Sequence, residues 1–210
     1  MQRSILSVSA VLCAVAALTA AGCGSSGSGS SSTSGSASGS ATSTGGSPGA
    51  LSAEAKSTAS GDIPDTQVYV TLRNAAGGYS MQFPEGWVQR GSGSDVTLQD
   101  KSNLIHIVVR RGAAPTAAAA AQALAGEKRT TPSLQAGAPT SVTIAGRPAI
   151  KIPYSTQGAA NPVTGKRVLL LVDRYILPGT GRYAIADLGT PKGVDNVDAY
   201  RMMIGSFRWR

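Results

Sequence analysis

The feature that most constrains the fold of this chain is where its large apolar residues lie. Residues Gly24 to Ala50 contain only Gly, Ser, Thr and Ala besides one proline, Pro48. Such a segment has no side chains with which to build a hydrophobic core. From Gln67 the sequence changes to short apolar runs separated by turn residues. We therefore expect one folded domain over 67–210, preceded over 23–66 by a disordered, flexible tether.

The composition of the tether sets its reach. A Gly/Ser-rich chain is a flexible coil whose end-to-end distance is about 5–6 Å times the square root of its length, so about 40 residues reach about 35 Å. The tether is thus expected to hold the domain away from the surface to which the chain is attached. Its Ser and Thr content also permits O-glycosylation.

The beginning of the chain has the order of an export signal. Met1 to Arg3 supplies positive charge, Ser4 to Leu18 is uncharged and mostly apolar, and small residues precede Cys23. The end of this segment resembles the lipobox of bacterial lipoproteins, although Ala20 stands where the usual motif prefers a branched aliphatic residue. The resemblance implies that residues 1–22 are removed and that Cys23 carries lipid, palmitate included. An uncleaved membrane helix and cleavage without lipid attachment are the alternatives.

Both cysteines of the chain, Cys13 and Cys23, lie in this signal region, so the mature protein is expected to lack disulfides. No later segment has the about 20 consecutive apolar residues that span a bilayer. Attachment to the membrane would then depend on lipid alone, and stable anchoring takes two or more acyl chains. A diacylglyceryl group on Cys23 supplies them. The expected location is the cell membrane, lipid-anchored on its extracytoplasmic face.

Charge is concentrated in the folded part of the chain. Residues 67–210 contain 17 Lys and Arg against 8 Asp and Glu, a net charge of +9. A basic domain held near a membrane attracts anionic head groups or anionic envelope polymers, and another envelope protein is a further candidate partner. Nucleic acid is not expected as a partner of an exported chain. The alternative is a basic bias without a partner.

Apolar periodicity and turn residues predict an α+β fold with an antiparallel sheet covered by helices. A helix is expected over Thr116–Lys128, which is rich in alanine. A closing helix is expected to begin at Asp195, with a core stripe of Val197, Tyr200, Ile204 and Phe207. The expected strands cover residues 68–72, 79–83, 95–100, 104–111, 141–144, 148–155, 167–177 and 182–188.

Three segments of the domain carry a resemblance. They are the strand Tyr79–Phe83 running into Pro84-Glu85-Gly86-Trp87, the hairpin Ala145-Gly146-Arg147-Pro148-Ala149, and the closing Ser206-Phe207-Arg208-Trp209. Their order is similar to that of the Mog/PsbP-like family and covers 67–210. The resemblance implies an α/β/α sandwich around an antiparallel sheet, used as an adaptor or assembly factor and not as an enzyme. It brings no catalytic residues with it.

The residues themselves point to no reaction. His106 is the single histidine and the domain has no cysteine, so a His/Cys metal cluster is excluded, and neither a metal nor a cofactor is expected. A Ser-His-Asp triad would need His106 as its base, and no Gly-x-Ser-x-Gly elbow precedes a helix. Gly165-Lys166-Arg167 lacks the spacing of a phosphate-binding loop. A small hydrolase with a carboxylate pair stays open as the alternative function.

Two sets of side chains are candidates for a ligand or partner surface. Trp87 follows a Pro-Glu-Gly turn and either closes the core or lines a groove. Four arginines form a basic patch if their strands are adjacent, and are otherwise solvated strand ends: Arg110, Arg111, Arg167 and Arg174. The expected function is that of a membrane-anchored extracytoplasmic lipoprotein, acting as a noncatalytic binding or assembly module of the cell envelope.

Overall fold

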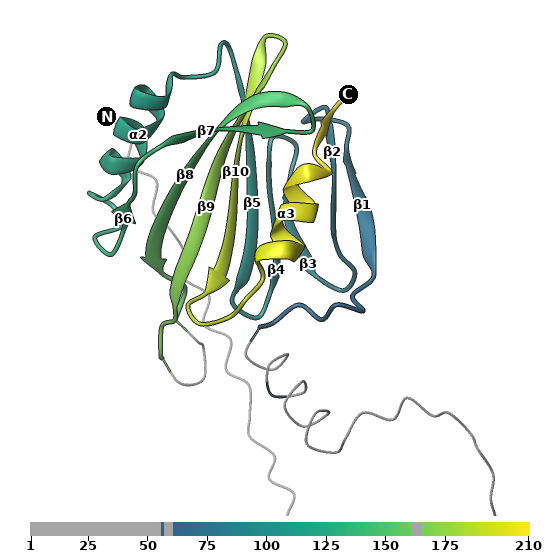
Figure 1. The fold of residues 1–210 in the computed structure, drawn as a ribbon, viewed down its shortest axis with the longest axis vertical. Coiled ribbons are helices and arrows are strands. Elements are labelled where there is room, and N and C mark those ends of the chain that lie inside the picture. The colour runs from purple at the N-terminus through teal and green to yellow at the C-terminus, as the bar shows by residue number, and fades with distance from the viewer. Residues whose placement is uncertain (1–55, 57–60, 161–164) are drawn as a thin grey trace, which may run out of the picture. The chain divides into compact units, whose positions relative to one another are not determined.

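The structure is a computed structural model that describes Lys56, residues 61–160 and residues 165–210 (Figure 1). The signal segment, Cys23 and nearly all of the expected tether therefore lie outside the described residues. The elements follow in the order β1 (Tyr69–Asn74), β2 (Tyr79–Pro84), β3 (Val88–Ser92), β4 (Asp95–Asp100), β5 (Asn103–Arg111), α2 (Ala117–Glu127), β6 (Gln135–Ala136), β7 (Thr140–Ile144), β8 (Arg147–Gln157), β9 (Leu169–Gly179), β10 (Arg182–Pro191), α3 (Val197–Gly205) and β11 (Arg208–Trp209).

The strands form two antiparallel sheets. The larger sheet has the order β3-β4-β5-β10-β9-β8-β6, with β7 paired to β8, and the smaller has the order β1-β2-β11. Each strand predicted from the sequence is present. The short strands β3, β6 and β11 were not predicted, and β3 is exposed along its whole length, so it has no alternation of apolar and polar residues to identify it.

Helix α2 covers one face of the larger sheet. The side chain of Thr116 caps its first turn by accepting a hydrogen bond from the main-chain N–H of Ala119 (3.2 Å). On the inner side of the helix Leu124 is fully buried, in a small core with Ile152 and Ile176 of the sheet. The predicted helix is thus confirmed to within one residue at each end.

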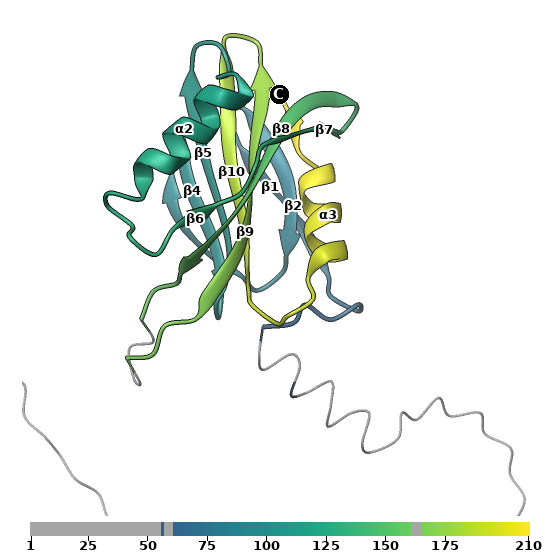
Figure 2. The ribbon, with the colours of Figure 1, turned by 60° about the vertical axis from the view of Figure 1, so that its left-hand side comes forward.

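Helix α3 and the smaller sheet cover the opposite face, as Figure 2 shows. Met203 and Ile204 of α3 pack into the main core with Tyr79 and Met81 of β2. The predicted core stripe is wrong at Val197, which is 60% exposed. The arrangement is an antiparallel sheet between two layers that each contain a helix, and this confirms the α+β sandwich.

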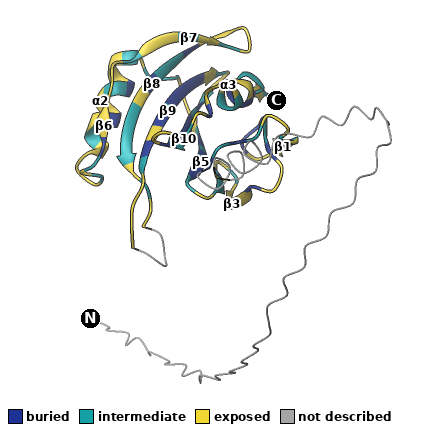
Figure 3. Ribbon diagram, turned by 60° about the horizontal axis from the view of Figure 1, so that its bottom comes forward, coloured by how far each residue is buried: buried dark blue, intermediate teal, exposed yellow. Residues whose placement is uncertain are grey.

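Burial divides the larger sheet into a buried centre and exposed margins (Figure 3). In β5, Ile105 and Ile107 point into the main core, while Leu104 and His106 lie on the α2 face and are only partly buried. Since α2 covers that face over β8 and β9, the part of the face formed by β4 and β5 stays more open.

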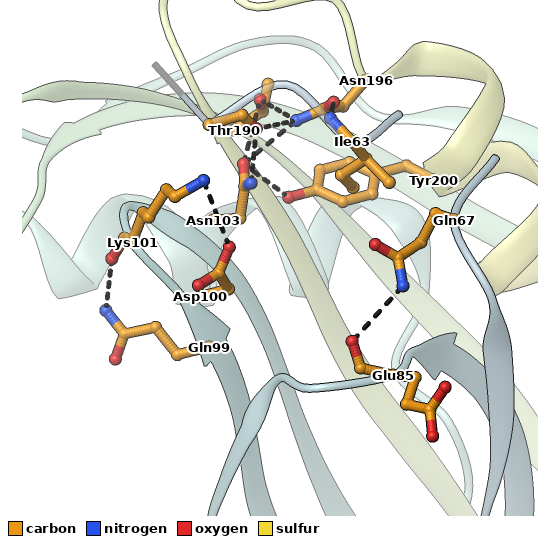
Figure 4. A network of polar contacts seen from close by, with 11 residues as sticks. Ile63, Gln67, Glu85, Gln99, Asp100, Lys101, Asn103, Thr190, Asn196 and Tyr200 are labelled. Carbon is orange, nitrogen blue, oxygen red and sulfur yellow. Dashed lines mark hydrogen bonds and ion pairs between the residues drawn. The ribbon is translucent and has the colours of Figure 1, made fainter. Parts of the chain in front are cut away.

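The chain joins the domain through a segment that belongs to the core (Figure 4). Ile63 is buried in the main core and its main-chain N–H donates to Oδ1 of Asn196 (2.9 Å). The carbonyl oxygen of Gly61 accepts from Nδ2 of Asn103 (2.6 Å) and Nδ2 of Asn196 (3.1 Å). Gly61 to Ile63, which precede the domain expected over 67–210, therefore pack against its core.

Candidate functional site

Arginines from distant segments gather at the end of the domain where β5 finishes and β10 begins. Arg111 and Arg182 are partners in the register of these two strands. The Arg182 guanidinium donates to the carbonyl oxygen of Gly78 (3.4 Å) and to the main-chain oxygen of Arg210 (2.7 Å), the last residue of the sequence, which connects this point to the β1–β2 turn and to β11. We call this the arginine end, and it comprises Arg73, Arg110, Arg111, Arg147, Arg182, Arg208 and Arg210.

Tight turns explain why two of these side chains lie there. The register of β7 with β8 and of β9 with β10 leaves two residues in each connecting turn, so Arg147 and Arg182 directly follow a reversal of the chain. The β7–β8 turn has φ values of 51° at Ala145 and 75° at Gly146. Positive φ at both central residues is the geometry of a type I′ hairpin turn.

The arginine end carries uncompensated charge. None of its seven arginines forms an ion pair with an Asp or Glu side chain of the described residues. Arg182 also lies over the ring of Trp209, with its guanidinium carbon 4.8 Å from the ring centroid. A local excess of positive charge results.

Acidic residues lie instead near the incoming segment at the opposite end. Asp62 and Asp65 flank Ile63, Asp195 precedes Asn196, and Asp100 is paired in register with Asn103. Strand β5 connects the two ends, because its first residue is Asn103 and its last is Arg111. Its nine residues span about 27 Å at about 3.4 Å a residue. The basic and acidic ends are thus separated by the length of the sheet.

The four arginines predicted as one patch do not come together. Arg110 and Arg111 are exposed at the arginine end. Arg167 is also exposed, but it lies beside the opposite end of β9, where it donates to the carbonyl oxygen of Gly158 (2.9 Å). Arg174 is 9% exposed, and this removes it from an exposed partner surface. The prediction for Arg174 is therefore corrected.

Arg174 is enclosed by two carboxylates on the α2 face. It donates to both carboxylate oxygens of Asp187 (2.7 and 2.8 Å) and to both of Glu127 (2.5 and 3.2 Å). Burial alone would lower the pKa of Arg174, but the hydrogen bonds to Asp187 and Glu127 outweigh it and raise that pKa. Tyr154 donates its hydroxyl to Asp187 (3.1 Å), and burial, followed by the charge of Asp187, raises the pKa of Tyr154. Each charged group is thus satisfied from within the cluster.

Trp87 lies in the main core with 9% of its surface exposed. Of the two interpretations of this residue, the structure supports the one in which it closes the core.

His106 forms a hydrogen bond between its Nε2 and the carboxylate of Asp95 (2.8 Å), on the open part of the α2 face. No group of three or more His, Cys, Asp or Glu residues that could hold a metal ion occurs in the part of the chain that the structure describes. Among the helices in that part, none has the length and apolar character to cross a membrane.

Three hollows stand out on the surface of the described residues. The largest of these three, about 630 Å³, lies between α3 and strands β8 and β9, and Leu171 and Val197 expose apolar surface beside it. A second, about 410 Å³, lies on the α2 face against the Arg174 cluster. The smallest, about 230 Å³, lies at the arginine end between Arg147 and Arg208.

Five of the seven residues of the arginine end were not predicted from the sequence. Arg147 and Arg182 could have been found, because each directly follows a predicted hairpin turn and therefore must lie at an end of the sheet. Arg73, Arg208 and Arg210 come from the smaller sheet, whose attachment to this end could not be predicted from local patterns.

Comparisons with known proteins find no matching family model and no matching curated protein. The solved structures to which the chain is similar include PsbP of the cyanobacterium Synechocystis sp. PCC 6803, at 14% identity and a TM-score of 0.46, over 71% of this chain and 98% of PsbP. The Ran-binding protein Mog1p of Saccharomyces cerevisiae is 10% identical with a TM-score of 0.43, over 69% and 96% of the two chains.

A third similar structure is LpqN, described as involved in cell envelope biogenesis of Mycobacterium tuberculosis. It is 15% identical with a TM-score of 0.37, over 70% of this chain and 86% of LpqN. These proteins include members of the family that the sequence resembles. Identities and TM-scores this low carry no partner or activity over to this chain.

Proposed function

We propose that this chain is a lipoprotein, anchored by Cys23 to the extracytoplasmic face of the cell membrane, that binds an anionic polymer of the cell envelope without catalysis. The observation that carries the proposal is the arginine end, where none of the seven arginines has a described Asp or Glu side chain as an ion-pair partner. This end lies opposite Gly61 to Ile63, the segment through which the described chain enters the domain.

The Arg174 cluster supports binding rather than hydrolysis. Asp187 and Glu127 lie on either side of one guanidinium, as two carboxylates that a hydrolase could use. Both bind that guanidinium, the one of Arg174, through both of their oxygens. Their oxygens are thus occupied by an internal partner. The hydrolase alternative is therefore the weaker one.

An extended polymer fits the arrangement of the arginines. They come from both sheets and from separate hairpins, so their charge is spread over a surface and not focused in one pocket. Contacts between exposed charges are screened over about 10 Å at 0.1 M salt. Binding should therefore weaken steeply as the salt concentration rises.

The test measures fluorescence anisotropy of labelled poly-L-glutamate with the full chain at low and high salt. The double variant Arg110→Glu/Arg111→Glu should lose most of its binding. Lys128→Glu/Arg129→Glu, an equal change of charge at exposed positions after α2, is the matched control and should lose much less. Equal losses of binding in the two double variants would show that only the net charge of the domain matters, which contradicts a site at the arginine end. Salt-insensitive binding, or cleavage of the polymer, would overturn the proposal.

The lipid anchor is tested separately. Cys23→Ala should abolish incorporation of labelled palmitate and release the chain from the membrane fraction. Labelling that survives the substitution would contradict the anchor without bearing on the arginine end.

The largest groove favours a second candidate function, the binding of an apolar ligand. Its volume of about 630 Å³ falls within the range of small-molecule sites, and Leu171 exposes 46% of its surface beside it. Nile red, an uncharged probe, should bind there and gain fluorescence. Leu171→Glu should remove the gain in fluorescence. Val68→Glu, at an exposed apolar residue that does not line the groove, should preserve it. Identical fluorescence of both variants would rule the groove out as the site.

A further inference from the structure

The smallest hollow combines charge and apolar surface in a way that the rest of the arginine end does not. This cleft lies between the β7–β8 turn and β11. Its floor is formed by the apolar side chains of Ile144, Leu177, Pro178, Phe207 and Trp209. Arg147 and Arg208 line it from separate segments. An occupant of the cleft would therefore meet two arginine side chains beside an apolar surface.

The floor of the cleft is fixed in place by its own contacts. The indole N–H of Trp209 donates to the carbonyl oxygen of Pro178 (2.9 Å). Phe207 meets the Trp209 ring edge to face, with centroids 5.1 Å apart, and stacks on Tyr79 at 5.4 Å. Arg182 lies over the indole ring. Because the floor is already ordered, little conformational entropy is lost there when a ligand binds.

The two arginines at the cleft have donors to spare. Arg208 uses Nη1 for the carbonyl oxygens of Gly205 (2.7 Å) and Phe207 (2.8 Å), which orients the guanidinium. Among the described residues, its Nε and Nη2 have no hydrogen-bond acceptor, and Arg147 has no hydrogen-bond or ion-pair partner. Two planar guanidinium groups that lack an acidic partner can donate hydrogen bonds to both oxygens of a carboxylate.

The backbone beside the cleft is strained where it positions Arg147. Ala145 has φ of 51°, a left-handed conformation that is unfavourable for a residue with a Cβ. The two-residue turn requires it and places Arg147 directly opposite Ile144, at the rim of the cleft.

We propose that the cleft binds the C-terminal residue of a partner polypeptide. Arg147 and Arg208 hold its α-carboxylate, and its apolar side chain lies on Pro178 and Trp209. In a C-terminal residue the carboxylate and the apolar side chain leave the same Cα, so both enter a cleft of about 230 Å³ together. An internal Asp or Glu would bring charge without an apolar group. The inference rests on the proposed function only in that the cleft lies at the arginine end, where the anionic polymer is proposed to bind.

The test uses the peptide Gly-Ser-Gly-Ser-Phe with a free C-terminus, its C-terminal amide, and the free acid ending in Gly, each titrated into the full chain by calorimetry. The free Phe acid should bind at least about tenfold more tightly than the amide, because charge-assisted hydrogen bonds to the carboxylate are lost. It should likewise exceed the Gly acid, which lacks the apolar side chain.

Arg147→Gln and Arg208→Gln should each weaken the free Phe acid and leave the amide unchanged. Arg110→Gln, at the same end but outside the cleft, should leave both unchanged. Arg147→Lys keeps the positive charge but lacks the two parallel N–H donors of a guanidinium, so it should bind the free Phe acid more tightly than Arg147→Gln does and less tightly than the parent chain. Thermal unfolding checks that each variant folds. Equal affinity for acid and amide, or no binding of the acid, would overturn this inference. Salt-dependent poly-L-glutamate binding in the same samples would show that the proposed function survives such a failure.

Discussion

The side-chain amide of Asn196 donates a hydrogen bond to the main-chain carbonyl of Gly61, 135 residues earlier in the chain (3.1 Å). Its Oδ1 accepts from the N–H of Ile63, and its Nδ2 also reaches Oδ1 of Asn103 (3.0 Å) and Oγ1 of Thr190 (2.9 Å). Asn196 is 2% exposed. One buried amide thus joins the incoming segment to the start of α3 and to β10 (Figure 4).

Asn196→Ala should lower the free energy of unfolding by about 2–4 kcal/mol, because it leaves the buried N–H of Ile63 without its acceptor and removes the donor nearest to Oδ1 of Asn103. A chain that begins at Gln67 lacks Gly61 and Ile63, so the same substitution should cost about half as much there. Urea unfolding of both chains, with and without the substitution, measures the difference.

Asp195→Ala is the control for this prediction. Asp195 is exposed and accepts one long hydrogen bond, from the N–H of Val197 (3.3 Å), so its loss should cost less than about 1 kcal/mol. An equal loss from Asn196→Ala in the two chains would contradict the role assigned to the incoming segment.

Much of the fold could be predicted because its elements have regular patterns. In β5 apolar residues alternate toward the core, and α2 is rich in alanine. Gly61 to Ile63 could not be predicted as part of the domain, since a glycine and a single isoleucine have no periodicity and are held by an asparagine distant in sequence. Val197 keeps helical spacing but lies beside an open groove, so its position in the pattern did not make it core.

The candidate site was predicted less well for a related reason. Sequence shows that Arg110, Arg111, Arg167 and Arg174 lie on or beside strands, but not which ends of the strands meet. Alternation along β9 puts Arg174 on the α2 face, next to Asp187 in the register of β10. Only the pairing of strands distinguishes a neutralised buried arginine from an exposed one.

Ala145→Asn should stabilise the domain. Ala145 has φ of 51° and precedes Gly146 in a two-residue turn, where Asn-Gly is the preferred sequence. Relief of the left-handed strain should raise the free energy of unfolding by about 0.5–1 kcal/mol. Thermal unfolding measures it, with Ala145→Val as the opposite control, which should destabilise. A lower melting temperature for the Asn variant would contradict the turn geometry.

Stability should fall above pH 10 in part through Tyr175. Burial, followed by the charge of Asp173, raises the pKa of Tyr175 to about 12 from an ordinary value of 10.0. Below pH 10 the folded and unfolded states both keep the proton, so this contribution is fully present. Between pH 10 and about 12 only the unfolded state loses it, and the free energy of unfolding falls by about 1.4 kcal/mol per pH unit.

Tyr175→Phe should remove this part of the alkaline loss. Urea unfolding at pH 8, 10 and 11.5 compares the variant with the parent chain, and absorbance at 295 nm follows tyrosine ionisation. The two chains should differ by a constant amount up to pH 10 and converge or cross above it. A difference that stays constant to pH 11.5 would show that Tyr175 ionises equally in both states.

Arg174→Met should be the most destabilising of these substitutions, at about 3–5 kcal/mol, because it leaves the buried carboxylate of Asp187 without its cation. Asp187 is 4% exposed and would keep only the hydroxyl of Tyr154. Glu127→Gln should cost less than about 1 kcal/mol, since 45% of the Glu127 side chain is exposed and its ion pair is screened.

The double variant Arg174→Met/Asp187→Leu separates charge from packing. Because a buried ion pair can be replaced by apolar residues of similar volume at little cost, it should recover most of the stability lost by Arg174→Met, as measured by urea unfolding. A double variant no more stable than the single would show that the loss comes from packing. Arg174 takes no part in the arginine end, so the double variant should also bind labelled poly-L-glutamate as the parent chain does, and weakened binding in a folded protein would place Arg174 within the binding surface after all.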